Sequence, residues 1–176
     1  MKLLYLLRIS LVLILLGWTT LHAVSAAGSN SSQLQPLAFL ATHEWQAILP
    51  DSPQGQKMKI HSHCTWSSNG QAIRIFSEFI TDGKARPYID GLYAWDPQQK
   101  VIVFWYVDAQ GGLTKGTVKM ESGTLMHEFE ELSGDGKSAA YLAKITPHED
   151  SWDNEIFARN SEGLKQIVKV RYEIMK

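Results

Sequence analysis

Hydrophobic and polar residues alternate along most of the chain from His43 onward, a pattern typical of half-buried β-strands. The pattern is most pronounced in Tyr88–Asp108, where two runs rich in aromatic and β-branched residues flank Asp96-Pro97-Gln98-Gln99. Proline favours the first central position of a tight turn, and an aspartate before it accepts hydrogen bonds from the turn amides. This segment therefore predicts a β-hairpin.

The second strand of this hairpin is apolar on both of its alternating faces. One face holds Val101, Val103, Trp105 and Val107, and the other holds Ile102, Phe104 and Tyr106. A strand of this kind is covered on both sides. We therefore expect either the N-terminal helix or a partner subunit to lie against the outside of the hairpin, and a homodimer is one candidate arrangement.

Turn signals separate the other alternating runs at spacings of about 8–15 residues. The expected strands are His43–Leu49, Lys57–Trp66, Gln71–Thr81, Tyr88–Trp95, Lys100–Val107, Leu113–Met120, Thr124–Leu132, Lys137–Thr146, Ser151–Arg159 and Leu164–Met175. Leu34–Thr42 has helical spacing instead, with Pro36 in its first turn, where proline is tolerated.

Short connections make sequence neighbours antiparallel partners, and a long meander must close or fold over to protect its edges. The pattern therefore predicts an all-β domain over residues 34–176, an antiparallel up-and-down β-barrel of about ten strands with one short N-terminal helix at one end.

Residues 1–27 have the order of a secretory signal peptide. Lys2 and Arg8 flank the first apolar residues, Ile9–Leu16 is an apolar core that contains one polar residue, Ser10, and small residues follow in Ala23–Ala27. This apolar run is shorter than the roughly 20 residues that a membrane span needs. We expect a cleaved signal at 1–27, a flexible N-terminus at 28–33, and a secreted or periplasmic protein with no stable membrane insertion.

The charge balance argues against nucleic acid as a partner. The chain has 17 Lys and Arg residues and 18 Asp and Glu residues, and residues 1–27 contain two basic and no acidic residues, which leaves 15 against 18. Nucleic-acid binding needs a basic face, and a net charge near −3 does not favour one. Cys64 is the only cysteine, so the exported domain has no internal disulfide and depends on its hydrophobic core.

A family resemblance rests on the short apolar helix, on Trp45 at the start of the first strand, on Gly91-Leu-Tyr-Ala-Trp-Asp-Pro97 before a hydrophobic strand, and on a final strand containing Tyr172. These features resemble the lipocalin-like β-barrels of the calycin superfamily, and are most similar to small exported bacterial members of uncharacterised function. The resemblance covers about Leu34–Lys176. Lipocalins have Gly-x-Trp in the first strand, and here only Trp45 matches. The resemblance implies binding of a small hydrophobic ligand in a lumen, and it does not imply catalysis.

Aromatic residues supply most of the candidate ligand contacts, because large rings either line a pocket or fill the barrel. The predicted ligand-binding residues are Trp66, Tyr93, Trp105, His127, Phe129, Tyr141 and Tyr172. No spacing assembles a catalytic set, so no catalytic residue is assigned. No cofactor is expected.

The histidines offer two further interpretations. His127 alternates with Leu125 and Phe129 and should point inward, where it would orient a ligand. The resemblance adds haem as an alternative, because haem-binding calycins use one lumen histidine as the axial ligand. His61 and His63 lie on one strand face about 7 Å apart. We interpret them as part of a polar outer face rather than as a metal site.

Three functions remain open from the sequence. The first is an exported protein that binds a small hydrophobic or amphipathic molecule in an aromatic-lined barrel. The second is an enzyme of the isomerase or cyclase type in the same cup, with His127 as its acid or base. The third is a solid-core interaction module with apolar outer residues. Glu128, Glu130 and Glu131 are interpreted as a solvated stretch of strand.

Overall fold

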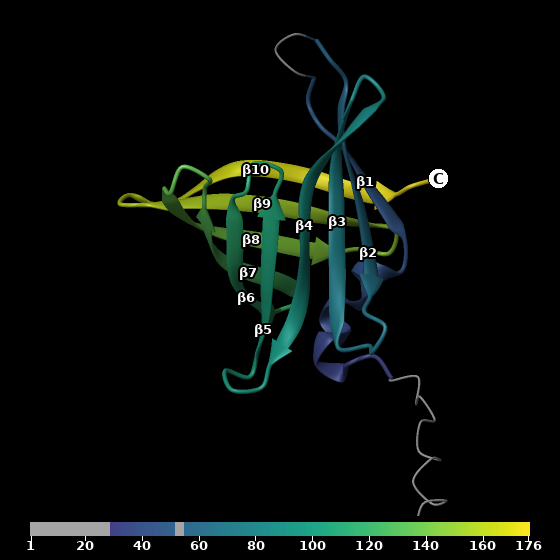
Figure 1. Cartoon of the computed structure of the whole chain (residues 1–176), viewed down its shortest axis with the longest axis vertical. Helices are drawn as coiled ribbons and strands as arrows, with labels where there is room; N and C mark the ends of the chain where they lie inside the picture. Colours follow the sequence, from purple (N-terminus) through teal and green to yellow (C-terminus); the bar gives the residue numbers. More distant parts are fainter. Residues whose placement is uncertain (1–28, 52–54) are drawn as a thin grey trace, which may run out of the picture.

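A computed structural model describes residues 29–51 and 55–176 of the chain. The described part contains ten antiparallel strands in a closed barrel, in which each strand pairs with its sequence neighbours and β1 pairs with β10 (Figure 1). The strands are β1 (Glu44–Ile48), β2 (Met58–Trp66), β3 (Ala72–Thr81), β4 (Lys84–Asp96), β5 (Val101–Asp108), β6 (Leu113–Glu121), β7 (Thr124–Leu132), β8 (Ser138–Pro147), β9 (Ser151–Asn160) and β10 (Gly163–Ile174). The predicted all-β up-and-down barrel is confirmed. The signal peptide expected at 1–27 lies outside the described residues.

Strand β4 begins earlier than the sequence pattern predicts. It starts at Lys84 rather than Tyr88, and Pro87 lies within it. The pairing of β3 with β4 shifts register between Ser77 and Glu78, and Glu78 pairs with Pro87. A bulge of this kind accommodates a residue that cannot donate to the ladder, so the proline does not end the strand.

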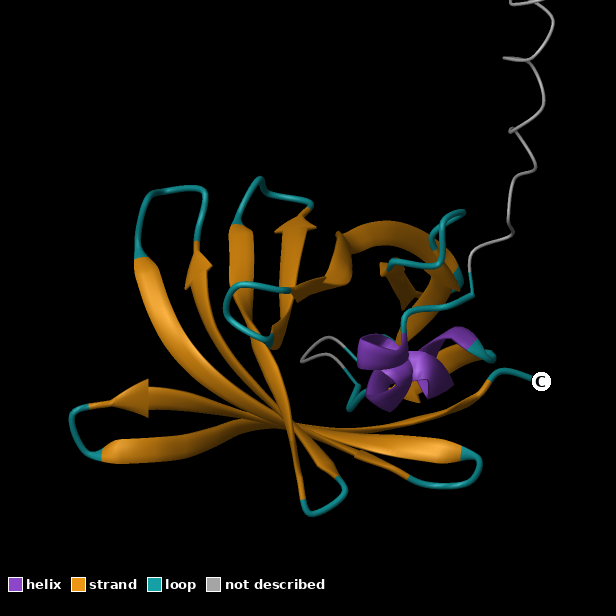
Figure 2. Cartoon of the chain, turned by 90° about the horizontal axis from the view of Figure 1, so that it is seen from below, coloured by secondary structure: helices purple, strands orange, loops and turns teal. Residues whose placement is uncertain are grey.

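The short N-terminal helix is a 3-10 helix, η1 (Ser32–Ala41), which packs against β2, β3 and β4 at the lower end of the barrel in Figure 1. Leu34, Leu37 and Leu40 are buried, and their spacing of three residues suits the three residues per turn of this helix type. The indole Nε1 of Trp45 donates to the Leu40 carbonyl oxygen at 3.0 Å. Figure 2 shows the helix from below, at the end of the barrel that it closes.

The helix does not cover the outside of the β4–β5 hairpin. Phe104 points into the barrel and is 1% exposed, whereas Trp105 and Val107 on the other face are 43% and 50% exposed. The cross-strand pairs Leu92–Trp105 and Val107–Leu113 continue this apolar outer strip onto the neighbouring strands. The expectation of a helix over this face is therefore wrong, and the partner subunit stays a prediction.

No helix within residues 29–51 and 55–176 combines the length and the hydropathy that crossing a membrane would require.

Candidate functional site

The barrel encloses a cavity of about 400 Å³. Its apolar wall consists of Leu49, Ile60, Ile75, Phe79, Ile89, Phe129, Ile145, Trp152, Ile156, Ile167, Val168 and Val170. Its polar residues are Ser62, Ser77, Tyr88, Tyr93, Tyr106, Thr114, Glu131, Tyr141, Asn154 and Tyr172. An apolar wall with a small number of placed polar groups is the usual composition of a small-molecule site.

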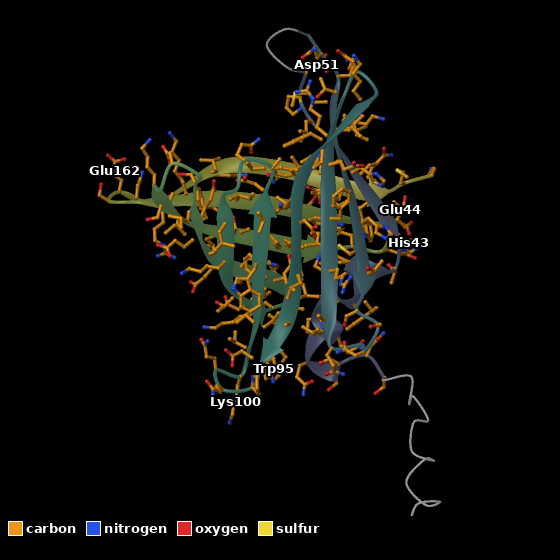
Figure 3. All side chains as sticks on the ribbon, in the orientation of Figure 1. His43, Glu44, Asp51, Trp95, Lys100 and Glu162 are labelled. Atoms are coloured by element: carbon orange, nitrogen blue, oxygen red, sulfur yellow. The ribbon has the colours of Figure 1, made fainter. Side chains whose placement is uncertain are left out.

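The two ends of the barrel differ. Trp95 and Lys100, labelled in Figure 3, mark the end where η1 packs. Odd-numbered strands end at the opposite end, where Asp51 and Glu162 lie on connecting loops. Thr114, near the start of β6, and Glu131, near the end of β7, belong to this opposite end and line the cavity. We call it the mouth of the cavity.

Two hydroxyl pairs lie deep in the cavity. Ser62 and Ser77 face each other across β2 and β3, and their hydroxyl oxygens are 2.7 Å apart in a hydrogen bond. The hydroxyls of Tyr93 and Tyr106 also share a hydrogen bond. Burial raises the pKa of both phenols, so both stay neutral. These groups satisfy each other, which lets the polar atoms remain in an apolar cup.

An aromatic stack forms another part of the wall. The rings of Trp152 and Tyr172 are parallel within 2°, with centroids 3.8 Å apart. Burial raises the pKa of the Tyr172 phenol, and the Ser62 hydroxyl partly offsets this effect. The indole Nε1 of Trp152 and the Oδ1 atom of Asn154 are buried without a hydrogen-bond partner among the described residues. Both residues line the cavity, although these two atoms are themselves covered by protein atoms.

Glu131 lines the mouth of the cavity and remains partly exposed, so the solvated stretch of β7 contains one residue that faces inward. It follows Leu125, His127 and Phe129 in the inward alternation of β7, and it pairs across the strands with Thr114. Sequence reasoning missed Glu131, Thr114 and Asn154 as cavity residues. The period of two in β7 was the available signal for Glu131, because it places every second residue on the same face.

The structure brings four of the predicted ligand-binding residues to the cavity, namely Tyr93, Phe129, Tyr141 and Tyr172. Phe129 and Tyr141 stack with centroids 5.3 Å apart. Trp66 is partly buried against the core but does not line the cavity. Trp105 lies on the outside of the barrel, because side chains alternate along β5 and Phe104 and Tyr106 take the inward positions. The placement of Trp105 in the lumen is therefore wrong.

His127 points inward as expected and is 2% exposed, but it lies outside the cavity lining. Its ring makes edge contacts with Tyr93 and Phe104 at centroid distances of 5.8 and 5.3 Å. Neither ring nitrogen has a hydrogen-bond partner in the described part of the chain. Burial lowers the pKa of His127 to about 4, and the Leu125 backbone opposes this effect. In this arrangement the nitrogens do not border the cavity, so His127 does not fit the role of axial ligand to a haem in the lumen.

Two other histidines, His61 and His63, lie on the outer face of β2. His61 and His63 each approach the Glu44 carboxylate at 3.3 Å. The described ranges contain no group of three or more His, Cys, Asp or Glu side chains arranged to hold a metal ion. Cys64, on the inner face of the same strand, is buried, and burial raises the pKa of its thiol to about 12. It is therefore a neutral thiol rather than a reactive thiolate.

Comparisons with known proteins add no family assignment. No family model and no curated protein matches the sequence. The likeness to lipocalin-like barrels consequently stands on the architecture: a closed antiparallel barrel with a short helix at one end and a cavity inside.

Proposed function

We propose that this protein is an exported, secreted or periplasmic, carrier or sensor that binds a small hydrophobic or amphipathic molecule inside its barrel. The observation that supports this proposal is the cavity of about 400 Å³ with a mainly apolar wall. Cavities that hold small organic molecules have volumes of roughly 300–1,000 Å³ and the same composition. Tyr93, Phe129, Tyr141 and Tyr172 are the proposed ring contacts.

The cavity favours binding over the other two functions. A solid-core interaction module would have its lumen filled by side chains, although the outer strip around Trp105 remains a candidate contact surface for a second subunit. An enzyme based on His127 would need its imidazole at the cavity wall, and Tyr93 occupies the wall beside it. Binding of a ligand in the lumen, by contrast, requires no movement of His127 or Tyr93.

A pair of variants on β6 tests the proposal. Thr114 lines the cavity, and its neighbour Lys115 points outward with a side chain 60% exposed. Thr114→Trp should fill the mouth and weaken the binding of a lipophile at least tenfold, which corresponds to about 1.4 kcal/mol. Lys115→Trp adds the same ring outside the barrel and should leave the affinity unchanged.

Binding is measured by isothermal titration calorimetry against linear and aromatic lipophiles, and native mass spectrometry of protein purified from its host searches for a copurified molecule. A tight complex that Thr114→Trp weakens and Lys115→Trp preserves would support a lumen site. Equal affinity in both variants would place the ligand elsewhere and contradict the proposal.

A further inference from the structure

One side chain of the cavity wall carries a formal charge, and it is acidic. Of the described residues that line the cavity, Glu131 is the charged one, and no Lys, Arg or His is among them. The inward alternation of β7 explains its position, since Phe129 precedes it on the same face. A ligand that enters the lumen must therefore pass or contact a carboxylate.

The Glu131 carboxylate has no cationic partner within the described residues. The neighbouring acidic residues of β7 face outward and approach cations, Glu130 at 4.0 Å from Lys115 and Glu128 at 3.9 Å from Arg159. No ion pair or side-chain hydrogen bond joins Glu131 to another described residue. A half-buried carboxylate without a partner gains from an incoming cation, because the charge-assisted hydrogen bond replaces lost hydration.

Aromatic residues line the cavity together with this carboxylate. Tyr88, Phe129 and Tyr141 belong to the same wall, and Tyr141 pairs across the strands with Phe129, two residues before Glu131. The negative charge of Glu131 also adds to burial in raising the pKa of Tyr88 and of Tyr141. Phe79 packs on Tyr88 with ring centroids 4.1 Å apart, and Phe129 stacks on Tyr141. Ring faces attract ammonium and guanidinium groups, so the mouth offers both a counter-charge and aromatic surfaces to a cation.

A second carboxylate increases the negative potential near the mouth. Asp108, at the end of β5, also raises the pKa of Tyr88. Its Oδ1 accepts hydrogen bonds from the Gln110 and Gly112 amides at 2.7 and 2.9 Å, which hold it in place. A fatty acid or another amphiphilic anion would bring its carboxylate toward these charges, and the part of the cavity wall formed by residues 29–51 and 55–176 offers no basic side chain to receive it.

We propose that the cavity binds an amphipathic organic cation, whose protonated amine or other cationic group contacts Glu131 between Tyr88 and Tyr141 while its apolar body extends toward the Trp152–Tyr172 stack. This inference rests on the proposed lumen-binding function and specifies its ligand class. The hydroxyl pairs at depth are satisfied by each other, so the deeper cavity favours an apolar body over a second charged group.

The test compares three ligands with the same ten-carbon chain and different head groups, namely decylammonium, decanol and decanoate. Each is titrated at neutral pH into the wild-type protein by calorimetry, the two ionic ligands below their critical micelle concentrations and decanol below its solubility limit. We expect decylammonium to bind about tenfold or more tightly than decanol, which is the usual effect of one charge-assisted hydrogen bond. Decanoate should bind more weakly than decanol.

Two matched variants connect this preference to one residue. Glu131→Gln removes the inward charge and keeps the shape, and it should reduce the ratio of decylammonium to decanol affinity to about one. Glu130→Gln makes the same change in net charge on the outer face and should retain the wild-type ratio.

The outcomes separate the ligand class from the function. If decanol or decanoate binds wild-type protein as tightly as decylammonium does, the cation preference is overturned while lumen binding stands. If Glu131→Gln keeps the preference, Glu131 is not its origin and the inference also fails. If none of the three ligands binds, the result contradicts the proposed function itself.

Discussion

At the scale of single residues, His127 makes the stability of the barrel depend on pH. Burial lowers its pKa in the folded protein from the ordinary 6.5 to about 4. As the pH falls below 6.5, the unfolded chain takes up the proton first, and protonation favours unfolding. The stabilisation from the neutral imidazole is therefore complete above pH 6.5 and is lost progressively down to about pH 4. The expected loss is about 3 kcal/mol, measured by urea denaturation at a series of pH values.

His127→Phe is the matched variant for this prediction. It keeps an aromatic ring of similar size against Tyr93 and Phe104, and it removes two nitrogens that have no partner among the described residues. Its stability at pH 7 should equal or exceed that of the wild type. The pH dependence between 6.5 and 4 should flatten. Below about pH 5 the unfolded chain also protonates carboxyls whose pKa is lowered in the folded protein, such as Asp153 beside Arg171. The decisive range is therefore pH 6.5 to 5, and a slope that persists there in His127→Phe would contradict the assignment.

Two inward residues of β7, His127 and Glu131, show which side-chain positions could be predicted from the sequence and which could not. Alternation in β7 correctly placed His127 inside the barrel. Extending the same alternation past Phe129 places Glu131 inside, but its charge and its acidic neighbours favoured a solvated position. The alternation predicts an inward side chain and the charge predicts contact with water, and at the mouth of the cavity Glu131 meets both conditions. Whether an inward histidine touches a ligand depends on the rings packed beside it, and a period of two carries no information on that packing.

At the scale of elements, Gly91 allows the β4–β5 hairpin to form its close cross-strand contact. Gly91 pairs with Tyr106, and an added Cβ would collide with the Trp105 carbonyl oxygen and lie 2.7 Å from Tyr106 Cδ1. Because a backbone atom cannot move away easily, Gly91→Ala should reduce the unfolding free energy by about 2–3 kcal/mol. Leu92→Ala on the outer face should cost less. Urea denaturation of both variants measures the difference, and a stable Gly91→Ala protein would contradict this account.

Most strand positions followed from turn chemistry and alternation, and the errors occur at irregularities of the ladder. β4 began earlier than expected because the bulge at Ser77/Glu78 tolerates Pro87. In β10, pairing with β9 shifts between Gln166 and Val168, so Ile167 departs from the alternation and still lines the cavity mouth. A bulge is a property of the pairing between two strands, so the pattern of one strand does not reveal it.

At the scale of the whole molecule, closure was predictable and the cavity was not. The short connections predict a single meander, and the sequence pattern predicts no further sheet or helix that would cover its two edge strands. A meander of this length therefore protects its edges by closing. The volume that remains inside depends on how far each ring extends across the lumen. Tyr93 and Tyr106 turn toward each other and hydrogen bond, and Trp152 and Tyr172 lie flat on each other. These pairings leave about 400 Å³ free. They join side chains of paired strands, β4 with β5 and β9 with β10, and they depend on how each ring turns in the lumen, which the pattern of a strand does not reveal.

The seam that closes the barrel is short, and its stability should depend on Tyr172. β1 pairs with β10 through Trp45–Ile174, Gln46–Glu173 and Ala47–Tyr172, and these partners are separated by most of the chain. Bringing β1 and β10 together closes a loop that contains most of the chain, and the contacts at the seam must offset the entropy lost in closing it. Tyr172 pairs with Ala47 across the seam and is 6% exposed. It stacks on Trp152 of β9, whose ring in turn contacts Trp45 of β1 with centroids 6.3 Å apart, so this ring cluster links both sides of the seam.

Tyr172→Ala should therefore reduce the unfolding free energy by about 3–5 kcal/mol, as truncation of a buried aromatic residue does. Glu173→Ala, on the exposed side of the same seam, should change it by less than about 0.5 kcal/mol. Hydrogen exchange should show the amides of β1 and β10 losing protection before those of the β4–β5 hairpin, because the seam has the fewest cross-strand pairs to break. If β1 and β10 kept their protection in Tyr172→Ala while the hairpin exchanged first, closure would depend on contacts other than this stack.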